Sequence, residues 1–414
     1  MSESYPPEGK THSQAGLPAE IWVLVTASFV IALGFGIVSP ALPQYARSFG
    51  VGVTAATAVI SAFALMRLLF APMSGKLVQR SGERPVYLAG LVIVALSTGA
   101  CALAQDYWQL LAFRSLGGIG STMFTVSALG LIIRISPSHM RGRVSGFYAT
   151  SFLLGSISGP LVGSALIRFG LRVPFAIYAV ALVIAAAVVY FALRDSTLAS
   201  PEVGGPVRTM TLREGLFQRA YRAALWSSFA NGWAVFGVRM AIIPLFVVEA
   251  LHQEEAITGI ALTVFAVGNA LVLLPAGRYS DRYGRRPFLI LGCGVCGVST
   301  IAMGFTDNLV LFLIVSLVAG LGSGMINPAQ QAAVADIIGS KARGGPVLAA
   351  FQMASDVGAV LGPIAAGALA QGISYSAAFA VTGAVLVIAT FGWLLVPETM
   401  VRSDVSARDA DPDQ

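Results

Sequence analysis

The sequence has few charged residues, which make up 11% of its 414 positions, whereas a soluble domain has roughly a quarter. This number of charges is too small to cover the surface of a soluble protein of this length. A soluble fold is therefore excluded. Histidine is also scarce, and His12, His139 and His252 all lie outside the long apolar runs. Because Asp356 is the only acidic residue well inside such a run, the clustered side chains of a membrane enzyme are missing. We therefore expect neither an enzyme nor a cofactor.

Cysteine is rare as well, with three residues in the chain. Cys293 and Cys296 form a C-x-x-C pair inside an apolar run, without a second pair or a histidine that would complete a metal site. We expect both, together with Cys101, to be reduced packing residues and to hold no metal. The sequence also has no Gly-x4-Gly-Lys-Ser/Thr phosphate-binding signature, which argues against direct drive by ATP.

What the sequence has in abundance is long apolar stretches, with 56% hydrophobic residues overall. A helix needs about 20 mainly apolar residues to cross the hydrocarbon core of a bilayer. Twelve stretches meet this requirement: 21–43, 55–73, 85–104, 108–133, 144–167, 173–193, 223–248, 256–274, 287–305, 309–335, 346–369 and 375–396. The predicted fold class is therefore an all-α membrane protein with twelve transmembrane helices in two six-helix bundles.

One long polar linker separates the two sets of six stretches. The predicted organisation is a cytoplasmic tail (1–19), a first bundle (20–193), a cytoplasmic linker (194–222), a second bundle (223–398) and a second cytoplasmic tail (399–414). With both termini inside, most lysines and arginines fall in cytoplasmic segments, and the outer loops hold only Arg47, Arg168 and Arg172. This asymmetry is the positive-inside pattern of a multi-pass protein of the plasma (inner) membrane, so the net charge of +6 does not indicate a nucleic-acid partner.

The two halves repeat each other at a nearly constant spacing. Gly75–Pro85 recurs as Gly277–Pro287, 202 residues later. Gly155-x3-Gly159-Pro160 recurs in the same way as Gly358-x3-Gly362-Pro363. Six spans per unit give both units the same orientation in the membrane. Such a duplicated bundle supports alternating access, in which one half rocks against the other around a central site.

These motifs carry a family resemblance. The loops Gly75–Pro85 and Gly277–Pro287, the fourth-span segment Arg114–Gly120, the fifth-span segment Gly155–Gly163 and the first-span segment Gly34–Pro43 resemble signatures of the major facilitator superfamily. Within that superfamily, the chain is similar to the twelve-span drug:proton antiporters. The resemblance implies cytoplasmic gating by the two loops, a role for Arg114 in proton coupling, and proton-driven export of a small molecule.

The second-half loop contains charges that can form a cytoplasmic latch. Asp281 can pair with Arg282 or Arg285, and Asp336 is a further partner, although ordinary positive-inside charge without gating remains an alternative. The first half departs from this pattern, because Gln79, Glu83 and Arg134 stand at the corresponding positions. The predicted gating residues are Gly75, Gln79, Arg80, Gly277, Asp281, Arg282, Arg285 and Asp336.

Small residues on the fifth span predict close helix packing. Gly155, Gly159 and Gly163 share one helix face, and the absence of side chains there lets another helix approach. Pro160 removes a backbone donor and can kink the span.

Charges inside the spans are the main indication of a transport site, because a charge near the bilayer centre needs a partner or a hydrated cavity. Asp356 can be a proton carrier or a permanent ion-pair partner of an arginine. Arg67, Arg114 and Arg239 also lie in spans, and Arg239 could instead extend to the outer surface. Three arginines against one aspartate favour an anionic, zwitterionic or neutral substrate. The predicted cavity residues are Arg67, Arg239, Trp233, Asn269, Asn327, Gln330, Gln331 and Gln352.

The predicted function is proton-coupled export of small lipophilic or drug-like molecules by a monomer that contacts membrane lipids. The alternative is an importer or uniporter of a sugar or other metabolite, and a transporter-derived sensor is a further possibility. A channel would need a ring of like residues from symmetric subunits, which a duplicated monomer does not offer.

Overall fold

The computed structural model describes residues 19–135, 141–194, 210–338 and 345–400, which are almost entirely helical. The first half contains α1 (Ala19–Val38), α2 (Ala41–Arg47), α3 (Val53–Ser81), α4 (Glu83–Leu103), α5 (Tyr107–Ile135), α6 (Arg141–Ile167) and α7 (Val173–Ala192). The second half contains α8 (Leu212–Phe217), α9 (Arg219–Asn231), the π-helix η2 (Gly232–Val238), α10 (Arg239–Glu249), α11 (Ile257–Tyr283), α12 (Arg285–Met303), α13 (Leu309–Ile338), α14 (Gly345–Gly372) and α15 (Tyr375–Leu394).

Eleven segments of the described chain are long and apolar enough to cross a membrane. The first of them joins α1 to α2, and another runs continuously through α9, η2 and α10. The helix α5, Tyr107–Ile135, is as long as these spans and packs lengthwise against α3 and α4, so it supplies the twelfth. Two of the loops between spans turn on glycines with positive φ, Gly82 (81°) and Gly284 (108°), which lie at equivalent positions of the repeat. Other residues would be strained there.

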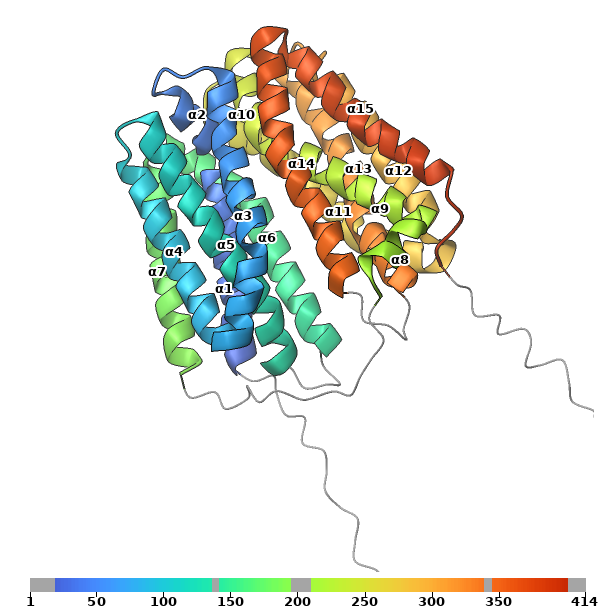
Figure 1. Ribbon diagram of the computed structural model, residues 1–414. Helices are drawn as coiled ribbons and strands as arrows, with labels where there is room; N and C mark the ends of the chain where they lie inside the picture. The colour runs from blue at the N-terminus through green and yellow to red at the C-terminus, as the bar shows by residue number, and fades with distance from the viewer. Residues whose placement is uncertain (1–18, 136–140, 195–209, 339–344, 401–414) are drawn as a thin grey trace, which may run out of the picture.

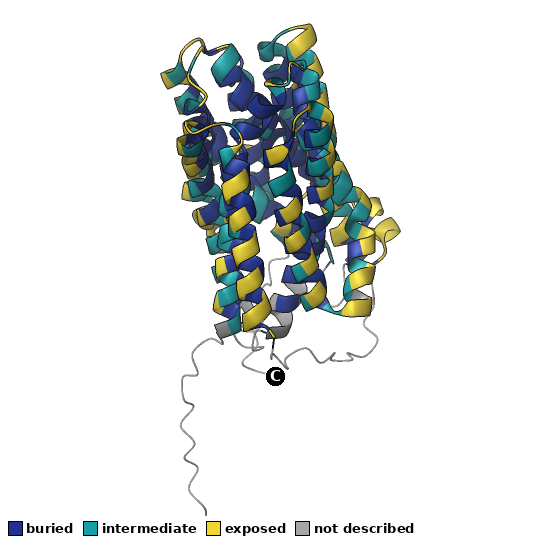
Figure 2. Ribbon diagram, turned by 90° about the vertical axis from the view of Figure 1, so that its left-hand side faces the viewer, coloured by how far each residue is buried: buried dark blue, intermediate teal, exposed yellow. Residues whose placement is uncertain are grey.

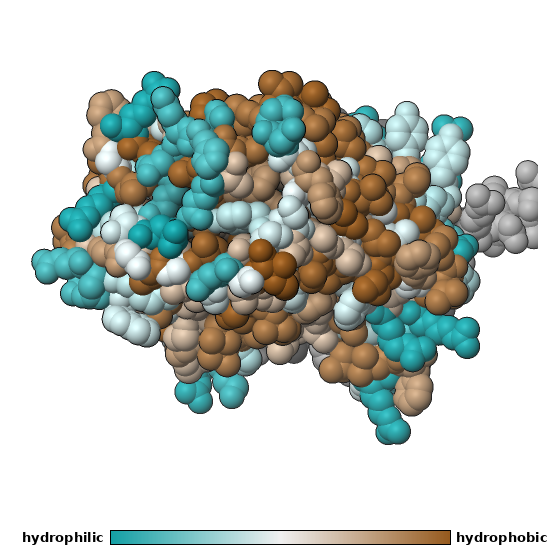
Figure 3. All heavy atoms as spheres, turned by 90° about the horizontal axis from the view of Figure 1, so that it is seen from above, coloured by the Kyte–Doolittle hydropathy of each residue, from teal (hydrophilic) through white to brown (hydrophobic). Residues whose placement is uncertain are grey.

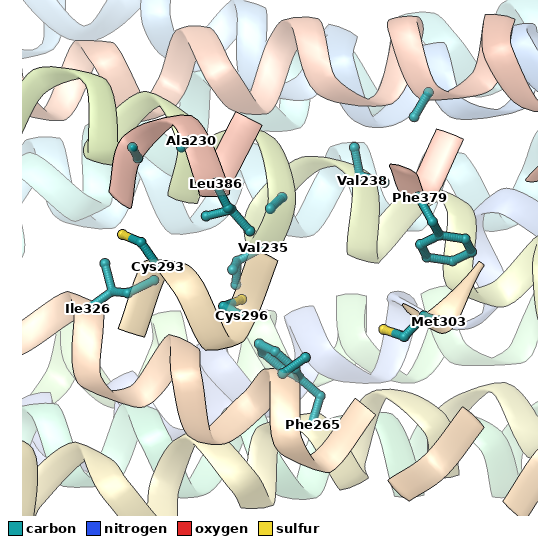
Figure 4. Close-up of a cluster of buried hydrophobic side chains, with 14 of the residues drawn as sticks. Ala230, Val235, Val238, Phe265, Cys293, Cys296, Met303, Ile326, Phe379 and Leu386 are labelled. Carbon is teal, nitrogen blue, oxygen red and sulfur yellow. The ribbon is translucent and has the colours of Figure 1, made fainter. Parts of the chain in front are cut away.

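The helices form two bundles, α1–α7 and α9–α15, which stand side by side (Figure 1). Each bundle has its own core of buried apolar side chains. In the first bundle Tyr87 and Phe175 are fully buried, and in the second Phe312 and Trp393 are. Figure 4 shows part of the second core, in which the free, buried Cys293 and its neighbour Cys296 lie among apolar side chains. Within the described residues they act as packing residues.

The outer surface of the bundles is apolar. Exposed residues follow the outward faces of the helices (Figure 2), and the end of the molecule seen from above shows apolar areas between hydrophilic patches (Figure 3). Large side chains such as Leu96, Ile184, Val298 and Leu395 are more than half exposed. A surface of this kind is stable in lipid and not in water.

In Figure 1 the helices of the two bundles lie close together at one end of their interface and diverge toward the other. We call the end at which α7 ends and α9 begins the linker end, and the opposite end the distal end. At the distal end, Arg47 Nε of the first bundle lies 2.9 Å from Glu249 Oε1 of the second. Thr54 Oγ1 on α3 donates to Gln371 Oε1 on α14 over 3.0 Å. The structure is therefore held closed at the distal end.

Candidate functional site

The acidic residue that the sequence places in mid-span lies where the two bundles face each other. Asp356 is on α14, which packs along α3 of the first bundle. Its carboxylate lies near the Gln352 side chain, one turn earlier on α14, and interacts electrostatically with Arg67 on α3. Arg67 Nη1 also donates to Ser121 Oγ over 3.3 Å. The structure thus places a carboxylate of one half within electrostatic reach of a guanidinium of the other, at a partly exposed position.

A matching polar contact exists in the second half without the charge. Asn269 on α11 stands at the position of the repeat that corresponds to Arg67, and its Nδ2 donates to Ser323 Oγ over 3.0 Å. Ser323 in turn corresponds to Ser121. The duplication has kept the hydrogen bond and changed only the charge of the donor.

The other two arginines inside spans are buried within their bundles, each 6% exposed. The Arg114 guanidinium carbon on α5 lies 4.2 Å from the centre of the Phe63 ring on α3. That of Arg239 on α10 lies 3.3 Å from the centre of the Phe265 ring on α11. The expectation that Arg239 could extend to the outer surface is therefore wrong, because the packing of α10 against α11 encloses its side chain.

The polar side chains of α13 and its neighbours divide into enclosed and exposed groups. Asn327 Oδ1 accepts from Asn231 Nδ2 over 3.2 Å. Gln330 is buried, and its Nε2 donates to Ala224 O over 3.2 Å and to Ser227 Oγ over 3.1 Å, which fixes α13 to α9. Gln331 and Gln352 are exposed.

Trp233 belongs to the π-helix η2, at the midpoint of the seventh span. Its Nε1 donates to Thr382 Oγ1 on α15 over 3.4 Å. The adjacent Gly232 lies so close to α14 that an added Cβ would stand 2.8 Å from Ser355 Cα, one residue before Asp356. Irregular helical turns of this type are frequent at functional sites.

The linker end of the second bundle carries the predicted latch residues in direct contact. Arg285 Nη1 forms an ion pair with Asp281, and its Nε lies 3.2 Å from Asp336 Oδ2. Arg282 is exposed and lies beside the Tyr283 ring, 5.5 Å from its centre. A single buried guanidinium therefore joins α11, α12 and α13.

The corresponding region of the first bundle is described in part. Gly75 and Gly277 lie within α3 and α11, and Arg80 is exposed near the end of α3. The side chains of Gln79 and Arg134 lie outside the described residues. Glu83 is buried, 7% exposed, and takes part in an interaction.

The glycines of the fifth span bring α6 against α1. A Cβ added at Gly155 would stand 2.6 Å from Phe29 O, and one at Gly159 would stand 2.6 Å from Gly36 Cα. The next glycine of this face, Gly163, packs against Ile37 of α1 in the same way. Pro160 follows Gly159 and also lies against α11 of the second bundle, next to Gly259. The motif therefore serves packing within the first bundle and contact between the bundles.

The Major Facilitator Superfamily model matches this chain over residues 24–238 and 224–411, which is nearly its whole length. The chain belongs to the Major Facilitator Superfamily. It is thus a multi-pass membrane transporter and not a member of an enzyme family, as the sequence motifs predict.

Curated relatives of this transporter cover most of its length. It is 26% identical over 356 residues to the quinolone resistance protein NorA of Staphylococcus aureus (strain COL), covering 84% of this chain and 89% of that one. It is 26% identical over 377 residues to the multi-drug resistance efflux pump PmrA homolog of Lactococcus lactis subsp. lactis (strain IL1403), covering 87% and 90%. The predicted similarity to drug-efflux members of the superfamily is confirmed.

Solved structures agree with the fold. A bacterial homolog of the human lysosomal transporter Spinster, in an inward-facing and unoccupied conformation, superposes with a TM-score of 0.77 at 16% identity, covering 92% of this chain and 97% of that one. A POT family transporter in complex with 5-aminolevulinic acid gives a TM-score of 0.75 at 12% identity, covering 92% and 96%. The predicted twelve-helix fold is therefore confirmed.

Two features of this transporter were missed by reading the sequence. At the distal end, Glu249 binds Arg47 of the other bundle and also accepts a hydrogen bond from Tyr375 over 2.6 Å. Arg47 and Glu249 occupy equivalent positions of the repeat. They can meet because a residue close to the axis that relates the two halves lies close to its equivalent in the other half. Ser39 and Met240, almost equivalent, also meet there, with Oγ and Sδ 2.6 Å apart. Opposite charges at repeat-equivalent span ends are the signal that could have found this pair.

The second missed feature is Glu398, directly after the last span. Its carboxylate accepts hydrogen bonds from the backbone amides of Arg285 (2.8 Å) and Arg286 (3.1 Å), which begin α12. In return, the Arg286 side chain donates to Trp393 O (3.1 Å) and Leu394 O (2.7 Å), which end α15. Each helix end thus receives the opposite charge that its free backbone groups favour.

Proposed function

We propose that this transporter exports small lipophilic or drug-like molecules from the cytoplasm in exchange for protons. The rocking units are the bundles 20–193 and 223–398, and the functional unit is a monomer in the plasma membrane. The linker end, which collects most of the arginines, faces the cytoplasm under the positive-inside rule. The names of the relatives NorA and PmrA, which refer to quinolone resistance and multi-drug efflux, support export of foreign molecules.

The observation that carries this proposal is the position of Asp356. It is the one acidic residue in the middle of a span among the residues that the structure describes. A carboxylate can take up and release a proton, whereas the arginine opposite it stays charged. Protonation of Asp356 removes its attraction to Arg67, which lies in the other bundle. The energy of the contact between the bundles therefore depends on whether a proton is bound, and this dependence is what coupled transport needs.

Two sets of charges serve as the gates of this cycle. The pair Arg47–Glu249 holds the distal end closed in the form described, which leaves the linker end to admit a substrate. The cluster of Arg285, Asp281 and Asp336 braces the second bundle at the linker end and meets the first bundle when that end closes. A substrate between the bundles meets Arg67, Asp356 and the exposed Gln352.

Asp356→Asn in inverted membrane vesicles tests the proposal. The matched control is Asp307→Asn, which removes an exposed acid next to Asn308. With an acidic lumen, we expect the unchanged protein and the control to accumulate compounds from a panel of neutral, cationic and anionic probes. We expect Asp356→Asn to reduce accumulation more than about tenfold, since a lost coupling site costs at least one order of magnitude in rate.

Exchange of labelled for unlabelled probe without a pH gradient separates coupling from folding. Exchange needs only the conformational change, so we expect Asp356→Asn to retain it. Undiminished acid-driven accumulation in this variant contradicts the coupling role. Accumulation that requires an alkaline lumen, or that ignores the gradient, favours the importer or uniporter instead.

A further inference from the structure

The two buried arginines occupy the same place in their bundles although they come from different helices. Phe63 and Phe265 are equivalent in the repeat, and each ring carries a guanidinium group. The residue equivalent to Arg114 is Ser316, and Arg239 Nη1 donates to Ser316 Oγ over 3.5 Å. In the second bundle, the cation thus stands where Arg114 stands in the first, but the seventh span supplies it instead of the tenth. The repeat has preserved a buried positive charge rather than a residue position.

Neither charge is balanced by an acid within the described ranges. No salt bridge to Arg114 or Arg239 occurs there, and the Nε atom of each is buried without a hydrogen-bond partner. Arg67, by contrast, interacts electrostatically with Asp356. A phenyl ring stabilises a guanidinium at short range, but a neutral ring cannot cancel its charge at a distance as a carboxylate would. Two fixed positive charges therefore remain, one in each bundle, on the two sides of the space in which a substrate would be carried.

We propose that Arg114 and Arg239 make this transporter selective for amphiphilic molecules that carry a negative charge, such as a carboxylate, and that Arg239 is the second-half specificity residue. This inference rests on the proposed function, because it assumes that a substrate passes between the bundles. The two guanidinium groups act on the substrate through their electrostatic field and without direct contact. Arginine cannot lose its proton in a protein, so the field persists through the cycle. One charge acting across a partly screened interior changes the affinity for an anion by about tenfold.

The experiment compares two probes that differ by one charge, dansyl-phenylalanine and its methyl ester. Fluorescence titration of the purified transporter gives the dissociation constant of the ester divided by that of the acid. This ratio does not depend on proton coupling. We expect the unchanged protein to bind the acid at least about tenfold more tightly than the ester. Arg239→Gln should reduce this ratio about tenfold and leave ester binding unchanged, whereas Arg239→Lys keeps the charge and should keep the ratio.

A relocation variant tests whether the place of the charge matters. Arg239→Gln combined with Ser316→Arg supplies the guanidinium from α13, at the position that Arg114 occupies in the first bundle. We expect this double variant to regain the preference for the acid. Arg278→Gln, which removes an exposed arginine at the linker end, is the matched control and should change nothing.

Four outcomes overturn the inference. These are equal binding of the two probes to the unchanged protein, binding of neither probe, an equal loss of both probes in Arg239→Gln, and loss of the preference in Arg239→Lys. An equal loss would mean that Arg239 only supports packing. The proposed export function fails separately, when Asp356→Asn leaves acid-driven accumulation unchanged while the preference for the acid is intact.

Discussion

The two halves of this transporter share a backbone arrangement but differ in their charges. The contact of Arg67 with Ser121 recurs as that of Asn269 with Ser323. At the linker end, however, Glu83 in the first half stands where Arg285 stands in the second. The positions at which backbones approach closely have been kept since the duplication, whereas several of the positions that carry charge have changed.

The difference has a physical reason. Close packing between helices leaves no room for a side chain at the contact, so the residue there can change little. The stability of a charged side chain depends on its partner rather than on the spacing of the backbones, so two partner charges can change together without altering the fold. We expect this division to have three measurable consequences, from the largest effect to the smallest.

A leucine at a packing glycine should prevent folding in either half to the same extent. A Cβ at Gly155 would stand 2.6 Å from Phe29 O, and one at the equivalent Gly358 would stand 2.6 Å from Trp233 N. We expect Gly155→Leu and Gly358→Leu each to cost more than about 3 kcal/mol, the upper range for overpacking. Thermal unfolding followed by fluorescence-detected gel filtration measures the loss. Gly75→Leu is the control, since a Cβ there meets no atom. A large effect in one half alone would disprove the equivalence of the two packings.

Reversal of the charges at the second-half latch should be tolerated only as a pair. Arg285→Glu places a third acid beside Asp281 and Asp336. We expect this change to destabilise the protein by about 3 kcal/mol or more, because the side chain at position 285 is enclosed. The double variant Arg285→Glu with Asp336→Arg installs the pattern of Glu83 and Arg134 from the first half. We expect it to recover at least half of the lost melting temperature. A double variant as unstable as the single one would show that the two halves need different charges.

Two equivalent arginines, Arg84 at the start of α4 and Arg286 at the start of α12, donate to carbonyl groups at the end of the last span of their half and should give the smallest effect. Arg84 donates to Arg194 O (2.9 Å) and Tyr190 O (3.4 Å), as the equivalent Arg286 does to Leu394 O and Trp393 O. We expect Arg84→Gln and Arg286→Gln each to lower stability by about 1 kcal/mol, the ordinary contribution of such contacts. Chemical denaturation in detergent, with Arg80→Gln as an exposed control, would detect it. An Arg84 variant much less stable than the Arg286 variant would mean that this contact is not equivalent in the two halves.

The candidate site could be predicted from the sequence in residue identity but not in contact. Asp356 and the three arginines are identifiable because a charge in an apolar run is rare. The sequence did not show that Arg67 interacts electrostatically with Asp356 whereas Arg239 lies over Phe265. A span surrounded by lipid and other helices is apolar on most faces, so hydrophobic periodicity does not show which face meets the partner helix. For the same reason, the sequence did not show that Gln330 is enclosed and donates hydrogen bonds to α9.

The sequence by itself determined the number of spans, the duplication and the family, because bilayer thickness imposes a fixed length of apolar residues and repeated motifs record a duplication. Only the tertiary structure decided which charges meet. Glu249 binds Arg47, and Arg239 takes the place that Arg114 occupies in the first bundle. Such pairings follow from the rotation of each helix about its own axis and from the side on which its neighbours pack. Both are fixed by side-chain contacts between residues far apart in the chain, and no local pattern records them.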